Sequence, residues 1–347
     1  MVANEQLELQ LVWQGQLDDL VTSVACAPNG RGWAASSAAG AVVWNAGGGE
    51  LVSLQSATGE TISRVAFSAD SRWLAAGGQA GKLAIWNCDR ADVPPQLVTT
   101  IDIDEWIEQL VWHPTEPYLA IGYGAQIEVW DIPTATLKTA WKFDRSSVFD
   151  LVWHPDGEYI AAAGDKGGQI WSAIEPTAPS EKIAVDTTSL KLAWSPDGRY
   201  LAMGNLDRTL TVTDWQQPDE QWTLQGFPGK IRQLAWLNGT ALPSLAVASG
   251  ETIVLWELSV DAIAWHGLPL EGHQDVVTTT IAHPSEPILV AGGADGYACL
   301  WTVDGRIEQI LTLPILSGFT AIDWQPQALY LATGTHAGTI GIWIIPA

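Results

Sequence analysis

The sequence predicts an all-β chain: a single eight-bladed β-propeller of four-stranded antiparallel blades, closed by the N-terminal strand. Three observations predict this fold. An apolar strand that ends in tryptophan recurs at a nearly fixed interval, two further strands precede each copy, and the last repeat lacks a fourth strand at the C-terminal end of the chain. We therefore expect residues 1–347 to form one propeller.

The strand that ends in tryptophan occurs in eight copies, whose last residues lie 41 to 45 positions apart. This interval is typical of propeller blades built from four strands. One copy ends in threonine instead of tryptophan. The copies are AVVW (41–44), KLAIW (82–86), QIEVW (126–130), GGQIW (167–171), TLTVT (209–213), TIVLW (252–256), YACLW (297–301) and TIGIW (339–343).

A second apolar segment lies ahead of each tryptophan strand at a near-constant offset and ends in a turn rich in Pro, Asp, Asn or Gly. Examples are LVWHPD (151–156) and LAWSPD (192–197). A further apolar segment follows at once, as in EYIAAAG (158–164) and RYLAMG (199–204). Apolar runs closed by such turns are typical of hairpin strands. Three strands per repeat can therefore be located directly.

The fourth strand of each repeat is less regular, and only seven copies lie between the eight tryptophan strands. The chain stops at Ala347, a few residues after Trp343, while the apolar segment 7–13 at the other end has no partner. We expect this N-terminal strand, residues 7–13, to pair with the C-terminal blade, residues 319–345. Such pairing would remove an open sheet edge.

These repeats resemble the WD-repeat β-propeller family over essentially the whole chain. The seventh repeat keeps most of the family pattern, with Gly272-His273 before the first strand, Asp295 in a turn and Trp301 at the strand end. Trp130-Asp131 is the one literal Trp-Asp pair at a strand end, and Thr213 replaces the fifth tryptophan. The resemblance implies a non-catalytic scaffold without a cofactor, which binds protein or peptide partners through its loop faces.

The resemblance also implies where partners bind, because family members use the face formed by the loops that enter the first strands. The residues that map there are Trp106 and Glu108 in blade three, Phe149 in blade four, Arg232 in blade six and Thr320 in blade eight. Exposed rigid aromatic side chains are common anchors of protein interfaces. Trp106 and Phe149 belong to adjacent blades, and either form part of a partner site or pack locally under their own loops.

The formal charge of −23 comes from 39 acidic and 16 basic residues. Such a surface argues against binding to nucleic acid, whose phosphates are neutralised by lysine and arginine. A partner with a basic surface is one interpretation, and a soluble monomer kept apart by net charge is the other. The acidic segment from Asp89 to Glu108 contains one basic residue, Arg90. It either meets a basic partner or forms a solvated loop.

The three cysteines, Cys26, Cys88 and Cys299, are odd in number, widely spaced and set in apolar runs. They indicate core residues in a reducing compartment rather than a disulfide framework. The first ten residues lack the basic start and apolar run of a signal peptide, and no stretch has 18 consecutive apolar residues. We therefore expect a soluble cytoplasmic protein that does not bind membranes.

His113, His154 and His283 recur at the same turn position of their repeats. Two lie in neighbouring blades and the third lies three blades further round, so the three imidazoles are not expected to meet on one metal ion. No metal-protease, paired-cysteine, phosphate-loop or nucleophile-elbow pattern appears. We expect no catalytic or metal site and no cofactor. The alternative is a small-molecule or metal-binding protein or enzyme that uses the central channel.

Overall fold

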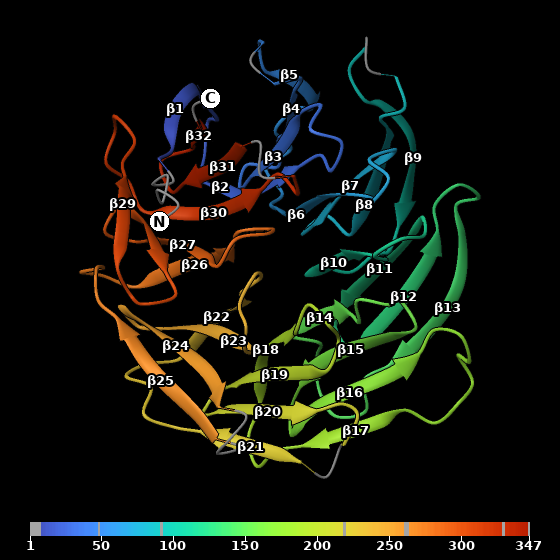
Figure 1. Cartoon of the computed structure of the whole chain (residues 1–347). Coiled ribbons are helices and arrows are strands. Elements are labelled where there is room, and N and C mark those ends of the chain that lie inside the picture. Colours follow the sequence, from blue (N-terminus) through green and yellow to red (C-terminus); the bar gives the residue numbers. More distant parts are fainter. Residues whose placement is uncertain are drawn as a thin grey trace.

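The computed structural model describes residues 8–47, 49–90, 93–217, 220–259, 264–327 and 330–345. These residues form eight four-stranded antiparallel sheets, arranged as blades around a common axis (Figure 1). The predicted all-β fold and the number of blades are confirmed. No helix long and apolar enough to cross a membrane is found in the described part of the chain.

Each of blades 1 to 4 is formed by four consecutive strands, counted from the axis outward. Blade 1 contains β2 (Val21–Cys26), β3 (Trp33–Ser37), β4 (Val42–Asn45) and β5 (Val52–Gln55), and blade 2 contains β6 (Ile62–Phe67), β7 (Trp73–Gly78), β8 (Lys82–Asn87) and β9 (Gln96–Asp102). Blade 3 contains β10 (Gln109–Trp112), β11 (Tyr118–Tyr123), β12 (Gln126–Asp131) and β13 (Thr136–Lys142), and blade 4 contains β14 (Asp150–Trp153), β15 (Tyr159–Gly164), β16 (Gly167–Ser172) and β17 (Glu181–Ala184).

Blades 5 to 7 follow the same plan, and blade 8 takes its fourth strand from the N-terminal end. Blade 5 contains β18 (Ser189–Trp194), β19 (Tyr200–Asn205), β20 (Leu210–Asp214) and β21 (Gln221–Leu224), and blade 6 contains β22 (Ile231–Trp236), β23 (Ser244–Ser249), β24 (Thr252–Ser259) and β25 (Ala264–Leu270). Blade 7 contains β26 (Val277–Ala282), β27 (Ile288–Gly293), β28 (Ala298–Thr302) and β29 (Ile307–Leu311), and blade 8 contains β30 (Phe319–Trp324), β31 (Tyr330–Thr335), β32 (Thr339–Ile344) and β1 (Gln10–Gln16).

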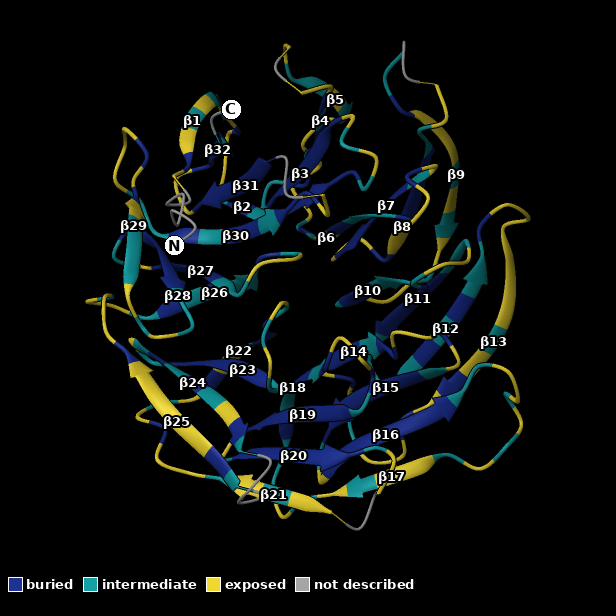
Figure 2. Ribbon diagram, viewed as in Figure 1, coloured by how far each residue is buried: buried dark blue, intermediate teal, exposed yellow. Residues whose placement is uncertain are grey.

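The first strands of adjacent blades contact one another all the way round, so the eight blades close into a ring. Burial is deepest in the second and third strands and falls toward the outer strands, as Figure 2 shows. The second strands are rich in alanine and glycine, for example YIAAAG in β15 and SLAVAS in β23. Small side chains let neighbouring sheets approach closely, while the tryptophans of the third strands fill the space toward the blade behind.

Closure by the N-terminal strand is confirmed, but the strand is displaced along the sequence. β1 begins at Gln10 rather than residue 7 and ends at Gln16, and it pairs with β32 in antiparallel register from Gln10–Ile344 to Gln16–Thr339. Residue 7 lies outside the described residues. The backbone of Leu9 also exchanges two hydrogen bonds of 2.7 Å with the side chain of Gln309 on β29. The N-terminal segment is therefore hydrogen-bonded to blade 7 as well as to blade 8.

Blade 5 lacks the tryptophan at its third-strand end, and Trp215 takes over its role. Thr213 is buried, while the indole of Trp215, two residues on, lies against the rings of Trp194 and Tyr159 at 5.7 and 5.4 Å between centroids. Tyr159 belongs to blade 4, so the substitute still packs between the two blades. A bulky side chain can therefore move along the strand and keep the inter-blade contact.

The three recurring histidines shape turns, and the imidazoles of two of them also bond to the next blade. In His113 the Nδ1 atom accepts two backbone N–H groups of its own turn, and in His154 the Nδ1 atom lies 2.6 Å from a carboxylate oxygen of Asp156 in its turn. The Nε2 atoms of the two rings bond the carbonyls of Gly157 and Gly198 in the next blade, at 3.1 and 2.8 Å. In His283 the Nδ1 atom accepts two backbone N–H groups in the same way. Burial lowers the pKa of His113 and His283, which favours the neutral imidazole that can accept these bonds.

Candidate functional site

One side chain from every blade lies around the axis, within or directly before the first strand, at the end where the chain enters the blade. We call these eight residues the axial ring: Thr22, Ser63, Glu108, Phe149, Leu190, Arg232, Thr278 and Thr320. In six of the eight blades this residue falls at a register shift between the first and second strands. A β-bulge leaves one residue outside the ladder and re-aims its side chain. All eight ring residues are half-buried or exposed, whereas the residue before each of them is buried.

Three threonines of the axial ring hold neighbouring blades together. The hydroxyl of Thr22 donates to the carbonyl of Ile62 at 2.6 Å, that of Thr278 to the carbonyl of Phe319 at 2.5 Å, and that of Thr320 to the carbonyl of Val21 at 2.6 Å. Thr320, predicted from the sequence as a partner-binding residue, therefore already joins blade 8 to blade 1. The hydroxyl members of the ring contribute to closure of the propeller.

A pocket of about 410 Å³ lies on this side of the axis, and three of the five predicted site residues line it. Trp106, Glu108 and Thr320 share it with Leu20, Val21, Thr22, Ser63 and Arg64, from blades 8, 1, 2 and 3. The indole N–H of Trp106 donates to the hydroxyl of Ser63 at 2.7 Å, and the residue keeps 49% of its surface exposed. Trp106 is thus an exposed aromatic side chain held in place across a blade boundary.

Phe149 and Arg232, the other two predicted site residues, do not line this pocket, although both are exposed. The backbone of Phe149 is held by its N–H, which donates to Ala163, and by its carbonyl, which accepts from the side-chain amide of Gln109. Its side chain is 39% exposed and makes no ring contact in the described part of the chain. The structure places both residues in the axial ring, further round from Glu108.

Leu190 is a ring residue that the sequence analysis missed. It follows Phe149 and precedes Arg232 in the order of the blades, so the ring reads Glu108, Phe149, Leu190 and Arg232 over blades 3 to 6. Alignment of all eight first strands would have found it, because each ring residue follows the first apolar or small residue of its strand. Two apolar side chains are thus flanked by a carboxylate and a guanidinium.

The two faces of the propeller differ in apolar exposure. We call the entry face the one formed by the loops into the first strands and the loops between second and third strands; the exit face carries the other loops. We compared the exposed large apolar side chains of the described residues that lie outside the outer strands. The exit face holds one of them, Ile174, and the entry face holds six: Trp106, Phe149, Leu206, Tyr297, Ile315 and Leu316. Exposed apolar groups gathered on one face are typical of binding surfaces.

Charge is also unevenly distributed on the entry face. The loops into blades 1, 2 and 3, residues 17–20, 56–61 and 103–108, contain no lysine or arginine but six carboxylates: Asp18, Asp19, Glu60, Asp104, Glu105 and Glu108. None of the six takes part in an ion pair with another described residue. The basic residues of the entry-face loops, Arg145, Lys166, Arg208 and Lys230, all belong to blades 4, 5 and 6.

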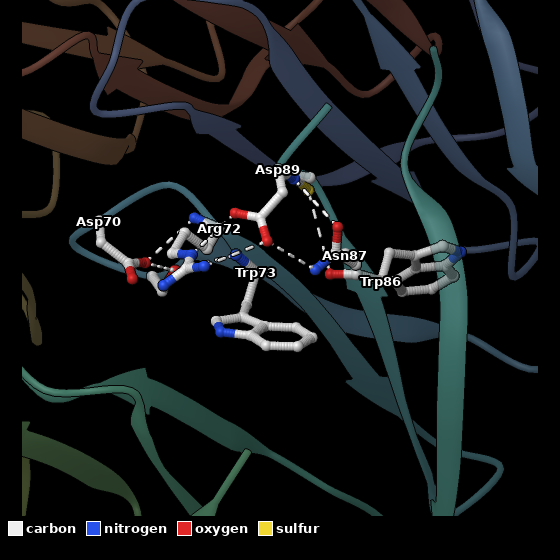
Figure 3. A network of polar contacts seen from close by, with 8 residues as sticks. Asp70, Arg72, Trp73, Trp86, Asn87 and Asp89 are labelled. Atoms are coloured by element: carbon white, nitrogen blue, oxygen red, sulfur yellow. Dashed lines mark hydrogen bonds and ion pairs between the residues drawn. The ribbon is translucent and has the colours of Figure 1, made fainter. Parts of the chain in front are cut away.

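The acidic segment from Asp89 to Glu108 does not form one cluster. Strand β9 separates its two ends, so Asp89 lies on the exit face and Asp104, Glu105 and Glu108 on the entry face. The guanidinium of Arg72 bonds Asp89 at 2.7 Å and, with a second bond from the side chain of Asn87, lowers the pKa of that carboxyl (Figure 3). Asp92 lies outside the described residues.

No group of three or more histidine, cysteine, aspartate or glutamate side chains that could hold a metal ion is found among the described residues. Glu108 is the one carboxylate that lines the pocket near the axis, and no histidine or cysteine accompanies it there. Cys26 and Cys299 are buried, Cys88 is half-buried, and all three are free thiols.

Comparison with known proteins agrees with the blade plan. The model of the family described as "WD domain, G-beta repeat" matches residues 49–87, 135–172, 185–214 and 267–302, and every match ends in or just after a third strand. No sequence among curated proteins matches the chain. The crystal structure of Sqt1 from Chaetomium thermophilum is similar, with a TM-score of 0.82 at 15% identity over 98% of this chain and 100% of that one.

A likeness at this identity shows the fold and leaves the function open, since one fold hosts many functions. The matched repeats lie in blades 2, 4, 5 and 7, and the other four blades share the same four-stranded plan. The chain is an eight-bladed β-propeller in which four segments match the WD-repeat family model.

Proposed function

We propose that this propeller is a non-catalytic scaffold that binds a protein or peptide partner through its entry face. The observation that carries the proposal is the gathering of exposed apolar side chains there, six against one on the exit face. Propellers of the WD-repeat family typically act as such scaffolds, with rigid blades that provide stability and loops that provide specificity. The free cysteines fit a reducing compartment, and we place this function in the cytoplasm.

Trp106 is the proposed anchor of the partner. Its indole is fixed by the hydrogen bond to Ser63, so little side-chain freedom remains to be lost when a partner covers the exposed half of the residue. Aromatic residues that are large, rigid and partly exposed are over-represented among the energetic centres of interfaces. Phe149, one blade further round, extends the apolar surface toward Leu190.

The test is affinity capture from a lysate of the native host, with the intact protein and the W106A/F149A variant in parallel. A partner retained by the intact protein and lost by the variant, at equal melting temperatures, supports the proposal. The matched control is L97A/V98A, which removes two exposed apolar side chains from the outer strand β9. A partner captured equally by all three proteins would refute entry-face binding.

A further inference from the structure

We propose that the entry face binds one class of partner, an extended segment with a basic end and an acidic end joined by apolar residues, and binds it in one orientation. The basic end lies over Glu108 and Trp106, the apolar middle over Phe149 and Leu190, and the acidic end at Arg232. This inference rests on the proposed function and adds the chemistry and the direction of the partner.

The axial ring supplies the first argument. Glu108 and Arg232 belong to blades 3 and 6, three blades apart in a ring of eight, so they lie nearly opposite each other across the axis. Neither side chain takes part in an ion pair or side-chain hydrogen bond with another described residue. A segment that follows the ring from blade 3 to blade 6 therefore meets an unpaired carboxylate at one end and an unpaired guanidinium at the other.

On the Glu108 side, the entry-face loops add five carboxylates and no basic residue: Asp18, Asp19, Glu60, Asp104 and Glu105. On the Arg232 side the loops carry both charges, four basic residues beside Asp144, Asp165, Asp186, Asp207 and Glu251, and Lys230 stands two residues before Arg232. Complementary potentials of this kind steer a charged partner during its approach and disfavour the reversed orientation, which would bring like charges together. A purely basic segment would be repelled at Arg232 and Lys230.

The local chemistry at each end fits the same occupant. A lysine or arginine side chain over the exposed face of Trp106 gains a cation–π contact while its charge reaches Glu108 in the same pocket. Arg64, also in that pocket and without a carboxylate partner in the described chain, offers N–H donors to carbonyl groups of the segment's backbone. At the other end, the guanidinium of Arg232 presents a planar fork to a carboxylate.

The test uses a synthetic peptide with a lysine/arginine block, a leucine block and an aspartate/glutamate block, measured by fluorescence anisotropy on the full-length protein. E108R and R232E should each weaken binding about tenfold, the loss of roughly one interfacial ion pair. The charge-swapped variant E108R/R232E should bind more tightly than either single variant, because the peptide can turn round, but more weakly than the wild type, because the loop carboxylates and Trp106 stay in place. E108Q and R232Q serve as milder variants if a reversed charge perturbs folding, as judged by thermal melting.

Orientation is read directly by a photo-crosslinker placed at the basic end of the peptide. In the wild type it should label chain fragments from blades 2 and 3, and in the charge-swapped variant fragments from blade 6. A control peptide with lysine/arginine blocks at both ends should bind about tenfold more weakly than the bipolar one, for the same ion-pair reason.

The outcomes separate the two proposals. Suppose that W106A/F149A loses its captured partner. If the basic control peptide then binds as well as the bipolar one, or if R232E does not weaken binding, the proposal of a bipolar segment is wrong and the proposal of an entry-face scaffold stands. If capture is also unaffected by W106A/F149A, both proposals fall. Labelling of blades 2 and 3 in both the wild type and the charge-swapped variant would likewise overturn the orientation.

Discussion

Deletion of residues 1–16 removes the whole of β1 and tests how much of the stability depends on closure of the ring. The deletion leaves β32 as an open edge and takes away both hydrogen bonds between Leu9 and Gln309. It also uncovers buried surface on two sides, because Leu9 packs in the cluster shared by blades 7 and 8, and Trp13 lies 4.9 Å from Trp33 between ring centroids.

The expected loss follows from the apolar side chains that the strand contributes. Leu9 is 2% exposed, and Leu11 and Trp13 are half-buried. At about 1.5–3 kcal/mol for each buried side chain, their removal lowers the free energy of unfolding by about 5 kcal/mol. Since globular proteins are stable by only about 5–15 kcal/mol, the truncated protein should lose much of its stability.

The assay is equilibrium unfolding in urea, followed by circular dichroism. With a slope of about 3 kcal/mol per molar urea for a chain of this size, the midpoint should fall by about 1.5 M. A synthetic peptide of residues 8–16, added in excess, should restore part of the loss, because it can pair with β32 in the observed register. V12A, which changes an exposed residue at the bulge of the same strand, is the matched control and should shift the midpoint little. An unchanged midpoint for the truncated protein would refute the closure argument.

Three further substitutions test single contacts. Trp215→Ala should cost about 2 kcal/mol of unfolding free energy, because the indole replaces the tryptophan missing at Thr213, and an unchanged calorimetric melting temperature would contradict this. Gly157→Ala should cost about 2 kcal/mol of unfolding free energy, because φ is +79° and a Cβ there would overlap the imidazole of His113. Adding His113→Ala should remove the overlap but not the backbone strain, and a double-mutant cycle without coupling would argue against the overlap. Burial between blades 8 and 1 raises the pKa of Asp323 from its ordinary 3.8 to about 7, so the folded state holds a proton that the unfolded state releases. The protonated group contributes at most about 4 kcal/mol to the free energy of unfolding. This contribution is complete below about pH 4 and is lost by about pH 7. Asp323→Asn should therefore show a shallower decline of stability from pH 4 to 7 than the wild type, and equal slopes would remove this role.

Much of the fold could be predicted because a propeller repeats the same short-range pattern. Strand, turn and tryptophan recur at fixed offsets, so each blade supports the assignment of the next, and a missing outer strand at one end predicted the use of the other end. The start of β1 was misplaced by three residues, because an apolar run shows that a strand exists but not where its ladder begins. The substitution of Trp215 for residue 213 was also beyond pattern matching, since it depends on the space between two sheets.

The place of the candidate residues in the fold was predictable, but their contacts were not. The offset of each residue from its strand was enough to place Glu108, Phe149, Arg232 and Thr320 in the axial ring and Trp106 just before it. Only the folded chain shows that the hydroxyl of Thr320 is engaged with Val21 and that Trp106 is fixed by Ser63. These contacts join residues about 300 and 43 positions apart along the sequence, so no local pattern records them.

By itself, the sequence determined the eight blades, the four strands of each and the closing role of the N-terminal end, because apolar periodicity and turn chemistry act over a few residues and repeat along the chain. The tertiary structure decided which charges face each other. It divided the acidic segment between two faces by inserting the length of β9, and it brought the unpaired Glu108 and Arg232 to opposite sides of the axis on one face. Electrostatic and binding properties depend on distance in space, and that distance is settled only when the ring closes.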